Sequence, residues 1–170
     1  MKRQIIFLLI LFSTCSIAFA QGNQSYAFQK LYLYTFMKYI EWPNAEVNEK
    51  FTIGFVGYSG LYPHLEKMAE EKEIRGKAIE LKKISSVEEA QQCQLLYVPS
   101  GQADLPNYIE ALKGSPVLIV SDLEGAAEEG AGFSFLMVDG KLKFDINTTT
   151  IEASQLSIKD ALKKFAVNTY

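Results

Sequence analysis

The sequence predicts an α/β fold: a three-layer sandwich with a mostly parallel sheet and an antiparallel hairpin near the C-terminus. Short continuous apolar segments alternate with segments of helical periodicity from residue 51 to residue 120. This alternation is typical of a parallel sheet that helices cover on both faces. Further along, Asp139-Gly140 separates two strand-like segments, which is a strong hairpin signal. An aromatic-rich helical segment precedes all of these elements.

The predicted elements follow one another without a repeat or a long linker, so we expect residues 21–170 to form one domain. Ser85-Ser86 followed by Glu88-Glu89 forms a capping box for a short helix, and Asn147 can cap another. The predicted strands are Phe51–Gly57, Ala78–Ile84, Gln94–Val98, Pro116–Val120, Phe133–Val138 and Lys141–Ile146, and the longer predicted helices are Leu61–Glu73, Asp104–Lys113 and Ser157–Val167.

The segment Tyr26–Trp42 predicts a helix with a wide apolar surface. Its apolar arc covers roughly half of the circumference, more than an ordinary surface helix has. Pro43 ends the helix, because the residue before a proline avoids the α region. Trp42, the only tryptophan, is expected to anchor the helix end against the sheet. The main stripe consists of Phe28, Tyr32, Phe36 and Tyr39, with Leu33, Met37 and Ile40 beside it.

A helix that packs on a sheet buries only part of an apolar arc of this width. The part that stays accessible is expected to bind a partner protein. The candidate partner surface consists of Tyr32, Tyr34, Met37 and Tyr39. The alternative is that the helix Ser157–Val167 covers the rest of the arc, which would make the whole arc core. In that case Leu162, Phe165 and Ala166 would form the buried side of the covering helix.

The first twenty residues have the three parts of a secretory signal peptide. A basic start at Lys2-Arg3 precedes the apolar run Ile5–Phe12, and Ala18-Phe19-Ala20 supplies the cleavage site. The apolar run is shorter than the about 20 residues that a permanent membrane helix needs. We therefore expect export to the periplasm, cleavage after Ala20 and no insertion of the mature protein into the membrane. A lipoprotein reading through Cys15 is disfavoured, because Thr14 is a poor residue before a lipidated cysteine.

Charge and cysteine content exclude several classes of function. Loss of Lys2 and Arg3 with the signal leaves 15 of the 17 basic residues against 20 acidic ones, a formal net charge of −5. Proteins that bind nucleic acid usually carry a net positive charge, so neither nucleic acid nor an anionic membrane surface is the expected partner. Cys93 is the single cysteine of the mature chain and cannot form an intramolecular disulfide. It precedes a predicted strand, which favours a buried structural thiol.

The chain lacks the motifs of the common extracytoplasmic enzymes. His64 is the only histidine, which excludes a multi-histidine zinc motif, and no Gly-x-Ser-x-Gly or Cys-x-x-Cys is present. Two carboxylates could hydrolyse a glycoside, but Asp145 alternates with apolar neighbours and is expected to face water. A hydrolase that uses Asp122 is therefore the least favoured hypothesis. No cofactor or metal is expected.

One edge of the sheet offers a second candidate site. Ligands of open α/β sheets bind at the carboxyl ends of the strands. Gly57 and Gly60 follow the first strand, and Asp122 and Gly125 follow the fourth. The glycine spacing does not match a phosphate-binding loop, so a tight turn that lets a helix pack close to the sheet is the preferred interpretation. These four residues form the candidate ligand edge.

Five strings together resemble the YfiR-like family of exported bacterial proteins. In that family an aromatic helix ends in Glu-Trp-Pro, as at Glu41-Trp42-Pro43. The strings occur in the same order and cover essentially the whole mature chain: Leu33–Pro43, Phe51–Gly57, Cys93–Pro99, Val117–Asp122 and Asp139–Asn147. Cys93 matches a family cysteine position, but its partner is missing here, so redox control through that disulfide is not expected.

The resemblance implies a non-enzymatic periplasmic regulator. The best-known member represses an inner-membrane diguanylate cyclase by binding its periplasmic sensor domain, and an outer-membrane lipoprotein sequesters it. In other members the domain is the extracytoplasmic input of a histidine kinase. We therefore expect a signalling regulator of the cyclic-di-GMP kind that binds and restrains a membrane-bound cyclase or kinase through its periplasmic part. The alternative is a periplasmic small-molecule-binding protein that uses the ligand edge.

Overall fold

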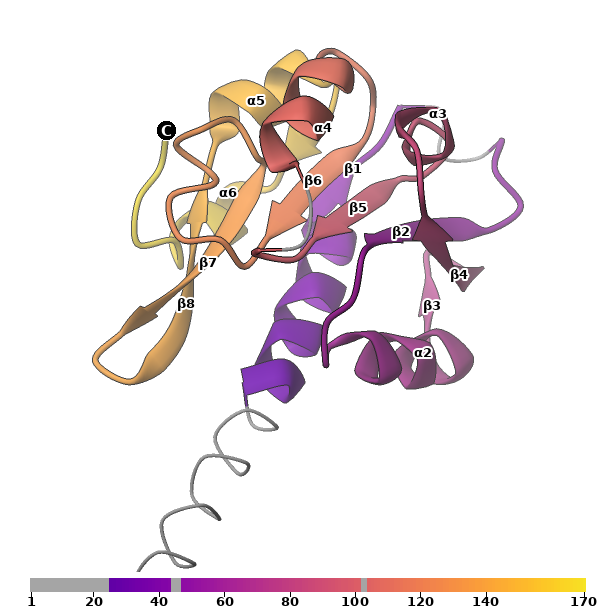
Figure 1. The fold of residues 1–170 in the computed structure, drawn as a ribbon, viewed down its shortest axis with the longest axis horizontal. Coiled ribbons are helices and arrows are strands. Elements are labelled where there is room, and N and C mark those ends of the chain that lie inside the picture. The colour runs from indigo at the N-terminus through magenta and orange to yellow at the C-terminus, as the bar shows by residue number, and fades with distance from the viewer. Residues whose placement is uncertain (1–24, 44–46, 102–103) are drawn as a thin grey trace, which may run out of the picture.

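The computed structural model describes residues 25–43, 47–101 and 104–170, and within them a seven-stranded sheet forms the centre of the molecule (Figure 1). Five neighbouring strands from β4 to β7 run parallel, whereas β3 and β8 join the two outer edges antiparallel. In spatial order the strands are β3 (Glu73–Ile74), β4 (Lys77–Ile84), β2 (Phe51–Val56), β5 (Leu95–Val98), β6 (Leu118–Ser121), β7 (Phe133–Val138) and β8 (Lys141–Ile146).

The central strands are buried on both faces, as their unbroken apolar sequence predicts. All four residues of β5 and all four of β6 are buried. Along β5, Leu95 and Tyr97 belong to one hydrophobic cluster, whereas Leu96 and Val98 belong to another. The sheet therefore separates two cores, one on each face.

Helices close both cores, which confirms the predicted three-layer α/β sandwich. The first core includes the helix over residues 25–39, here called the aromatic helix, and the buried side chains of α2 (Tyr62–Glu71) and α5 (Thr148–Ala153). The second core includes α3 (Val87–Ala90) and α4 (Leu105–Ala111). Asn147 caps α5 by accepting a hydrogen bond from the Thr150 N–H at 2.8 Å, as predicted.

The aromatic helix packs on the sheet mainly through phenylalanine rings. Phe36 is fully buried and stacks on Phe133 of β7, with 4.0 Å between the ring centroids. Phe144 of β8 meets the same ring edge-on at 5.0 Å. Such stacked and edge-on pairs are favourable beyond the area that they bury. They fix the helix across the β7–β8 half of the sheet.

The predicted hairpin is confirmed with its predicted bounds. Asp139 and Gly140 have φ values of 50° and 72°, which correspond to the two-residue turn that Asp-Gly favours. The hairpin projects from the body of the molecule beside the start of the aromatic helix (Figure 1). Residues 167–170 then run along the outer side of β8, where Ile146 pairs with Thr169.

The prediction of a C-terminal helix over Ser157–Val167 is wrong. Ser157–Ile158 instead forms strand β9, which pairs antiparallel with β1 (Ile40–Glu41) in a separate two-stranded sheet. Only Asp160–Lys163 is helical, as the single turn α6. Leu162 is buried as expected, but Phe165 is 70% exposed. The pairing with β1, and not the helix propensity of the sequence, determines the conformation of Ser157–Ile158.

The same two-stranded sheet changes the end of the first helix. The aromatic helix stops at residue 39, before the predicted end at Trp42, because Ile40 and Glu41 extend to pair with β9. The helix predicted at Leu61–Glu73 ends at Glu71 for a related reason, since Glu73–Ile74 pairs with β4 as β3. Long-range pairing thus shortens both helices.

Candidate functional site

Three large apolar side chains of the aromatic helix, Phe28, Leu31 and Tyr39, are exposed. Phe28 is 46% exposed, Leu31 57% and Tyr39 37%. These positions recur at helical spacing, so they share one side of the helix. Sequence reasoning placed Phe28 in the apolar stripe but did not single out Leu31. No short motif marks either residue.

The four predicted partner-surface residues have different surroundings. Tyr39 is exposed. Tyr32 is half-buried and donates from its hydroxyl to the Leu142 carbonyl at 3.3 Å, while Tyr34 donates to the Glu73 carbonyl at 3.3 Å. Met37 is fully buried in the first core and therefore does not belong to the surface of the folded chain.

A groove lies between the start of the aromatic helix and the tip of the β7–β8 hairpin, with a volume of about 720 Å³. Phe28 and Tyr32 line it from the helix, and Met137, which is 57% exposed, lines it from β7. The remaining lining residues are Ser25, Gly140, Lys141, Leu142 and Lys143. We call this the hairpin groove. Its exposed aromatic and thioether groups are of the kind that concentrates binding energy in protein interfaces.

The candidate ligand edge lies at the carboxyl ends of β2 and β6. Because β5 separates these strands, the pair Gly57 and Gly60 and the pair Asp122 and Gly125 lie on either side of the end of β5. Asp122 accepts a hydrogen bond from the Ser100 N–H at 2.5 Å.

Each glycine of the edge has a conformational or packing reason. The φ values are 65° for Gly57 and 84° for Gly125, which favour glycine. A Cβ atom at Gly60 would lie 2.6 Å from the Tyr26 ring, so this glycine permits close packing of the aromatic helix. Turn geometry and packing thus account for the glycines of the edge without a ligand.

Tyr97 is a fully buried phenol on β5 that points into the first core. Its ring stacks on Phe55 at 5.1 Å, and its hydroxyl has no hydrogen-bond partner within the described residues. Burial raises the pKa of Tyr97 far above its usual value, and the nearby Asp122 carboxylate raises it further. The phenol therefore stays neutral and cannot act as a base at physiological pH.

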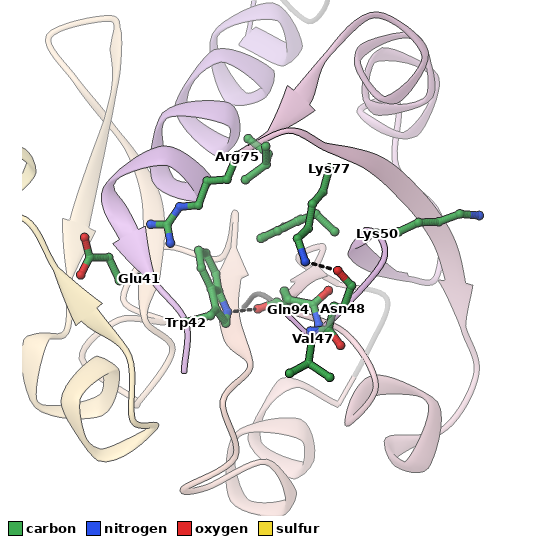
Figure 2. A pocket seen from close by; sticks show the side chains of 10 residues that line it. Glu41, Trp42, Val47, Asn48, Lys50, Arg75, Lys77 and Gln94 are labelled. Carbon is green, nitrogen blue, oxygen red and sulfur yellow. Dashed lines mark hydrogen bonds between the residues drawn. The ribbon is translucent and has the colours of Figure 1, made fainter. Parts of the chain in front are cut away.

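A second cavity, of about 600 Å³, lies beside Trp42 (Figure 2). Trp42 is nearly buried and donates from Nε1 to the Gln94 carbonyl at 2.9 Å, while its ring meets Phe51 edge-on at 5.0 Å. The prediction that Trp42 anchors the end of the helix to the sheet agrees with these contacts. The other lining residues are Glu41, Val47, Asn48, Lys50, Ile74, Arg75, Lys77 and Gln94.

Two cations line this cavity, Arg75 from the turn between β3 and β4 and Lys77 from the first position of β4. Arg75 donates from Nη2 to the Ile40 carbonyl at 2.7 Å, and Lys77 donates from Nζ to the Asn48 carbonyl. Arg75 and Gly76 have φ values of 53° and 75°, the geometry of a two-residue hairpin turn. Sequence reasoning missed this turn and its cations, although an Arg-Gly pair at the end of a helix could have indicated it.

The groups considered for catalysis are dispersed. Asp145, which was expected to face water, is buried on β8, where it accepts hydrogen bonds from Asn168 of the C-terminal segment. His64 lies on α2 with its ring 5.9 Å from that of Tyr26. Within the described residues, no three histidine, cysteine, aspartate or glutamate side chains cluster as a metal site. Over the same part of the chain, no helix combines the length and apolarity that crossing a bilayer requires.

Two solved structures resemble this chain in fold. A conserved domain protein from Vibrio cholerae O1 biovar El Tor has a TM-score of 0.50 and 15% identity over 70% of this chain and 54% of its own. The ABC domain from Streptococcus pneumoniae, solved in complex with L-Trp, has a TM-score of 0.50 and 16% identity over 71% of this chain and 55% of its own. The chain thus spans about half of the length of each.

The comparison with protein families identifies a family for this chain, whereas the two solved structures show only a similar fold. No curated protein matches the chain. By contrast, residues 26–167 match the family described as YfiR/HmsC-like. That match begins in the aromatic helix and ends in the segment that lines β8, so it includes the cavity beside Trp42 and all of the hairpin groove except Ser25. The resemblance inferred from the five strings is confirmed, and the chain belongs to the YfiR/HmsC-like family.

Proposed function

We propose that this protein is an exported, non-catalytic regulator that binds the periplasmic part of a membrane-bound signalling protein, such as a diguanylate cyclase, and restrains its output. The family match over residues 26–167 carries the proposal, because the best-known member of the YfiR-like family is a regulator of this kind. The active form would be the single domain of residues 21–170. The signal peptide expected at residues 1–20 lies outside the described residues and supports export on its sequence alone.

The exposed row of the aromatic helix supports the choice of surface. Phe28, Leu31 and Tyr39 have no role in the cores, and Phe28 continues into the hairpin groove. Large exposed apolar side chains that gather on one side of a helix mark protein interfaces. We therefore place the partner contact on this row and the adjoining groove, with Tyr32 at its inner edge.

Capture of the membrane partner tests this function. Tagged mature protein is incubated with solubilised membranes of the source cell, and bound proteins are identified by mass spectrometry. We expect enrichment of a membrane cyclase or kinase, and about tenfold less of it with the double variant Phe28→Ser/Leu31→Ser. Phe165→Ser is the matched control, because it removes an exposed apolar side chain at the other end of the chain. Recovery of no membrane signalling protein would contradict the proposal.

A small-molecule-binding function is the second candidate, and the cavity beside Trp42 favours it. Arg75 and Lys77 line this cavity together with the Trp42 indole, so a small ligand with a negative group and an apolar body would fit. Thermal shift measurements with amino acids and aromatic carboxylates test this alternative. A rise in the melting temperature that Arg75→Gln abolishes would support a small-molecule-binding function. If none of these compounds changes the melting temperature, this function is excluded. The predicted ligand edge would be probed in the same panel with Asp122→Asn.

A further inference from the structure

β8 is the outermost strand of the sheet, so one of its sides faces away from β7. Residues 167–170 occupy part of that side. The Val167 N–H donates to the Phe144 carbonyl at 2.9 Å, and the Tyr170 N–H donates to the Ile146 carbonyl at 2.9 Å. Backbone groups alternate in direction along an antiparallel ladder. The even-numbered residues of β8 therefore direct their backbone groups outward.

Among the described residues, no strand neighbours the other half of this side. Their only hydrogen bond to the Leu142 carbonyl comes from the Tyr32 hydroxyl, at the long distance of 3.3 Å. In the described part of the chain, no hydrogen bond occupies the N–H groups of Leu142 and Phe144. Outward N–H and carbonyl groups of this kind can pair with a further strand. The segment from Gly140 to Phe144 thus offers a short, unpaired sheet edge.

The two faces beside this edge differ in chemistry. Side chains alternate between the faces along a strand. On the helix face, the edge adjoins the hairpin groove with Phe28 and Met137. Lys141 and Lys143 also line the groove, but by this alternation their side chains lie on the face opposite that of Met137 and Leu142. An added strand would place every second side chain in the groove and the others beside the two lysines.

We propose that an extended segment of the membrane partner adds to β8 beside Lys141–Phe144, with apolar residues in the hairpin groove alternating with acidic residues beside Lys141 and Lys143. The lysines form a basic site on a mature chain of net charge −5, with Asp139 at the turn and the buried Asp145, two residues beyond Lys143 on the same face, as the nearby opposing charges. Cross-strand pairs of opposite charge stabilise a sheet and fix its register. Main-chain pairing supplies the affinity, and the alternating side chains supply the specificity.

This inference rests on the proposed function, but peptides test it separately. The probe is a fluorescein-labelled peptide with the core Leu-Glu-Val-Glu-Phe, and binding to the mature protein is measured by fluorescence anisotropy. The matched peptide Leu-Val-Phe-Glu-Glu has the same composition without the alternation. We expect the alternating peptide to bind at least about tenfold more tightly, because only its acidic side chains share one face.

Protein variants separate pairing from general electrostatic attraction. Lys141→Glu/Lys143→Glu should weaken binding about tenfold. The control Lys67→Glu/Lys72→Glu makes the same charge change at α2, which contacts β4 towards the opposite end of the sheet. It should leave binding unchanged. Equal loss in both double variants, or equal affinity for both peptides, would overturn the proposal.

Backbone pairing has its own readout. Amide hydrogen exchange at Leu142 should slow when the peptide binds, whereas exchange at Lys143, whose N–H faces β7, should not change. Leu142→Pro removes the outward donor without removing a ladder bond, and Leu142→Val keeps that donor. Binding retained by Leu142→Pro, or no slowing at Leu142 in the unmutated protein if the proline variant fails to fold, would exclude strand addition. Capture of a membrane partner without peptide binding would overturn this inference and leave the proposed function intact.

Discussion

The buried carboxylate of Asp145 accepts two hydrogen bonds from Asn168, one from the backbone N–H and one from the side-chain amide, each 3.0 Å long. This contact holds the C-terminal segment along the outer side of β8. The same segment places the Tyr170 carbonyl at the start of α5, where the Thr148 N–H donates to it at 2.8 Å. One carboxylate thus links the sheet edge, the C-terminal segment and a helix start.

Asp145→Ala is expected to destabilise the fold by about 1–3 kcal/mol, because it leaves the donors of Asn168 without their acceptor. The free energy of unfolding from urea denaturation, followed by circular dichroism, measures the effect. Asp145→Asn is the matched control, since its amide oxygen can still accept both hydrogen bonds, and it should cost less. An Asp145→Ala variant as stable as the unmutated protein would mean that the contact between Asp145 and Asn168 contributes nothing to stability.

Trp42→Ala is expected to cost about 3–5 kcal/mol of unfolding free energy, as the loss of a large buried aromatic side chain does. The indole packs against Phe51 and donates to the Gln94 carbonyl. Trp42→Phe keeps most of the buried ring and loses only the hydrogen bond, so it should cost clearly less. An unchanged denaturant midpoint for Trp42→Ala would refute the anchoring role and make Trp42 a candidate partner contact.

Cys93 should be unreactive in the native mature protein. Burial raises the pKa of its thiol to about 11, so at pH 8 nearly all of it is the protonated form, which is a poor nucleophile. We expect negligible reaction with Ellman's reagent at pH 8 in native conditions. In guanidinium chloride, one equivalent should react within minutes. Rapid labelling of the native protein would contradict the buried position of this thiol.

The central sheet could be predicted because its signals are local. β5 and β6 are unbroken apolar runs, and Asp139-Gly140 determines the hairpin turn on its own. Asn147 could be recognised as a cap for a comparable reason, since its side chain bonds an N–H only three residues away. Where hydrophobic pattern and turn chemistry agree within one segment, sequence alone determines the element.

The remaining features depend on partners far away in the sequence. Ser157–Ile158 has a helix-like start, but its pairing with Ile40–Glu41 makes it a strand. Asp145 alternates like a solvent-facing residue, yet Asn168 covers it. Neither of these outcomes has a short-range sequence signal.

Export is expected to yield a mature protein that begins at Gln21. The basic start, apolar run and Ala18-Phe19-Ala20 site predict cleavage there, which removes Cys15. N-terminal sequencing and intact mass of protein recovered from the periplasm measure the cleavage point. Retained Met1, or a mass that includes acyl chains on Cys15, would contradict this prediction.

The tyrosines of the aromatic helix should separate into structural and partner-binding residues. Tyr32→Ser is expected to destabilise the fold, because the ring meets Phe144 edge-on at 5.2 Å and its hydroxyl bonds the Leu142 carbonyl. Tyr39→Ser should leave stability nearly unchanged and reduce capture of the membrane partner, since this side chain is exposed. Tyr34 lies between these cases, with a single hydroxyl contact to β3.

Paired measurements of the denaturation midpoint and of partner capture distinguish these roles. Tyr34→Phe removes only the hydroxyl contact, so it serves as the control for Tyr34→Ser, in which the ring is lost as well. Full capture by a folded Tyr39→Ser variant would move the interface away from the C-terminal end of the helix, towards Phe28 and Leu31. Unfolding of all three serine variants would instead make these tyrosines core residues, and the partner would then have to dock on another surface of the domain.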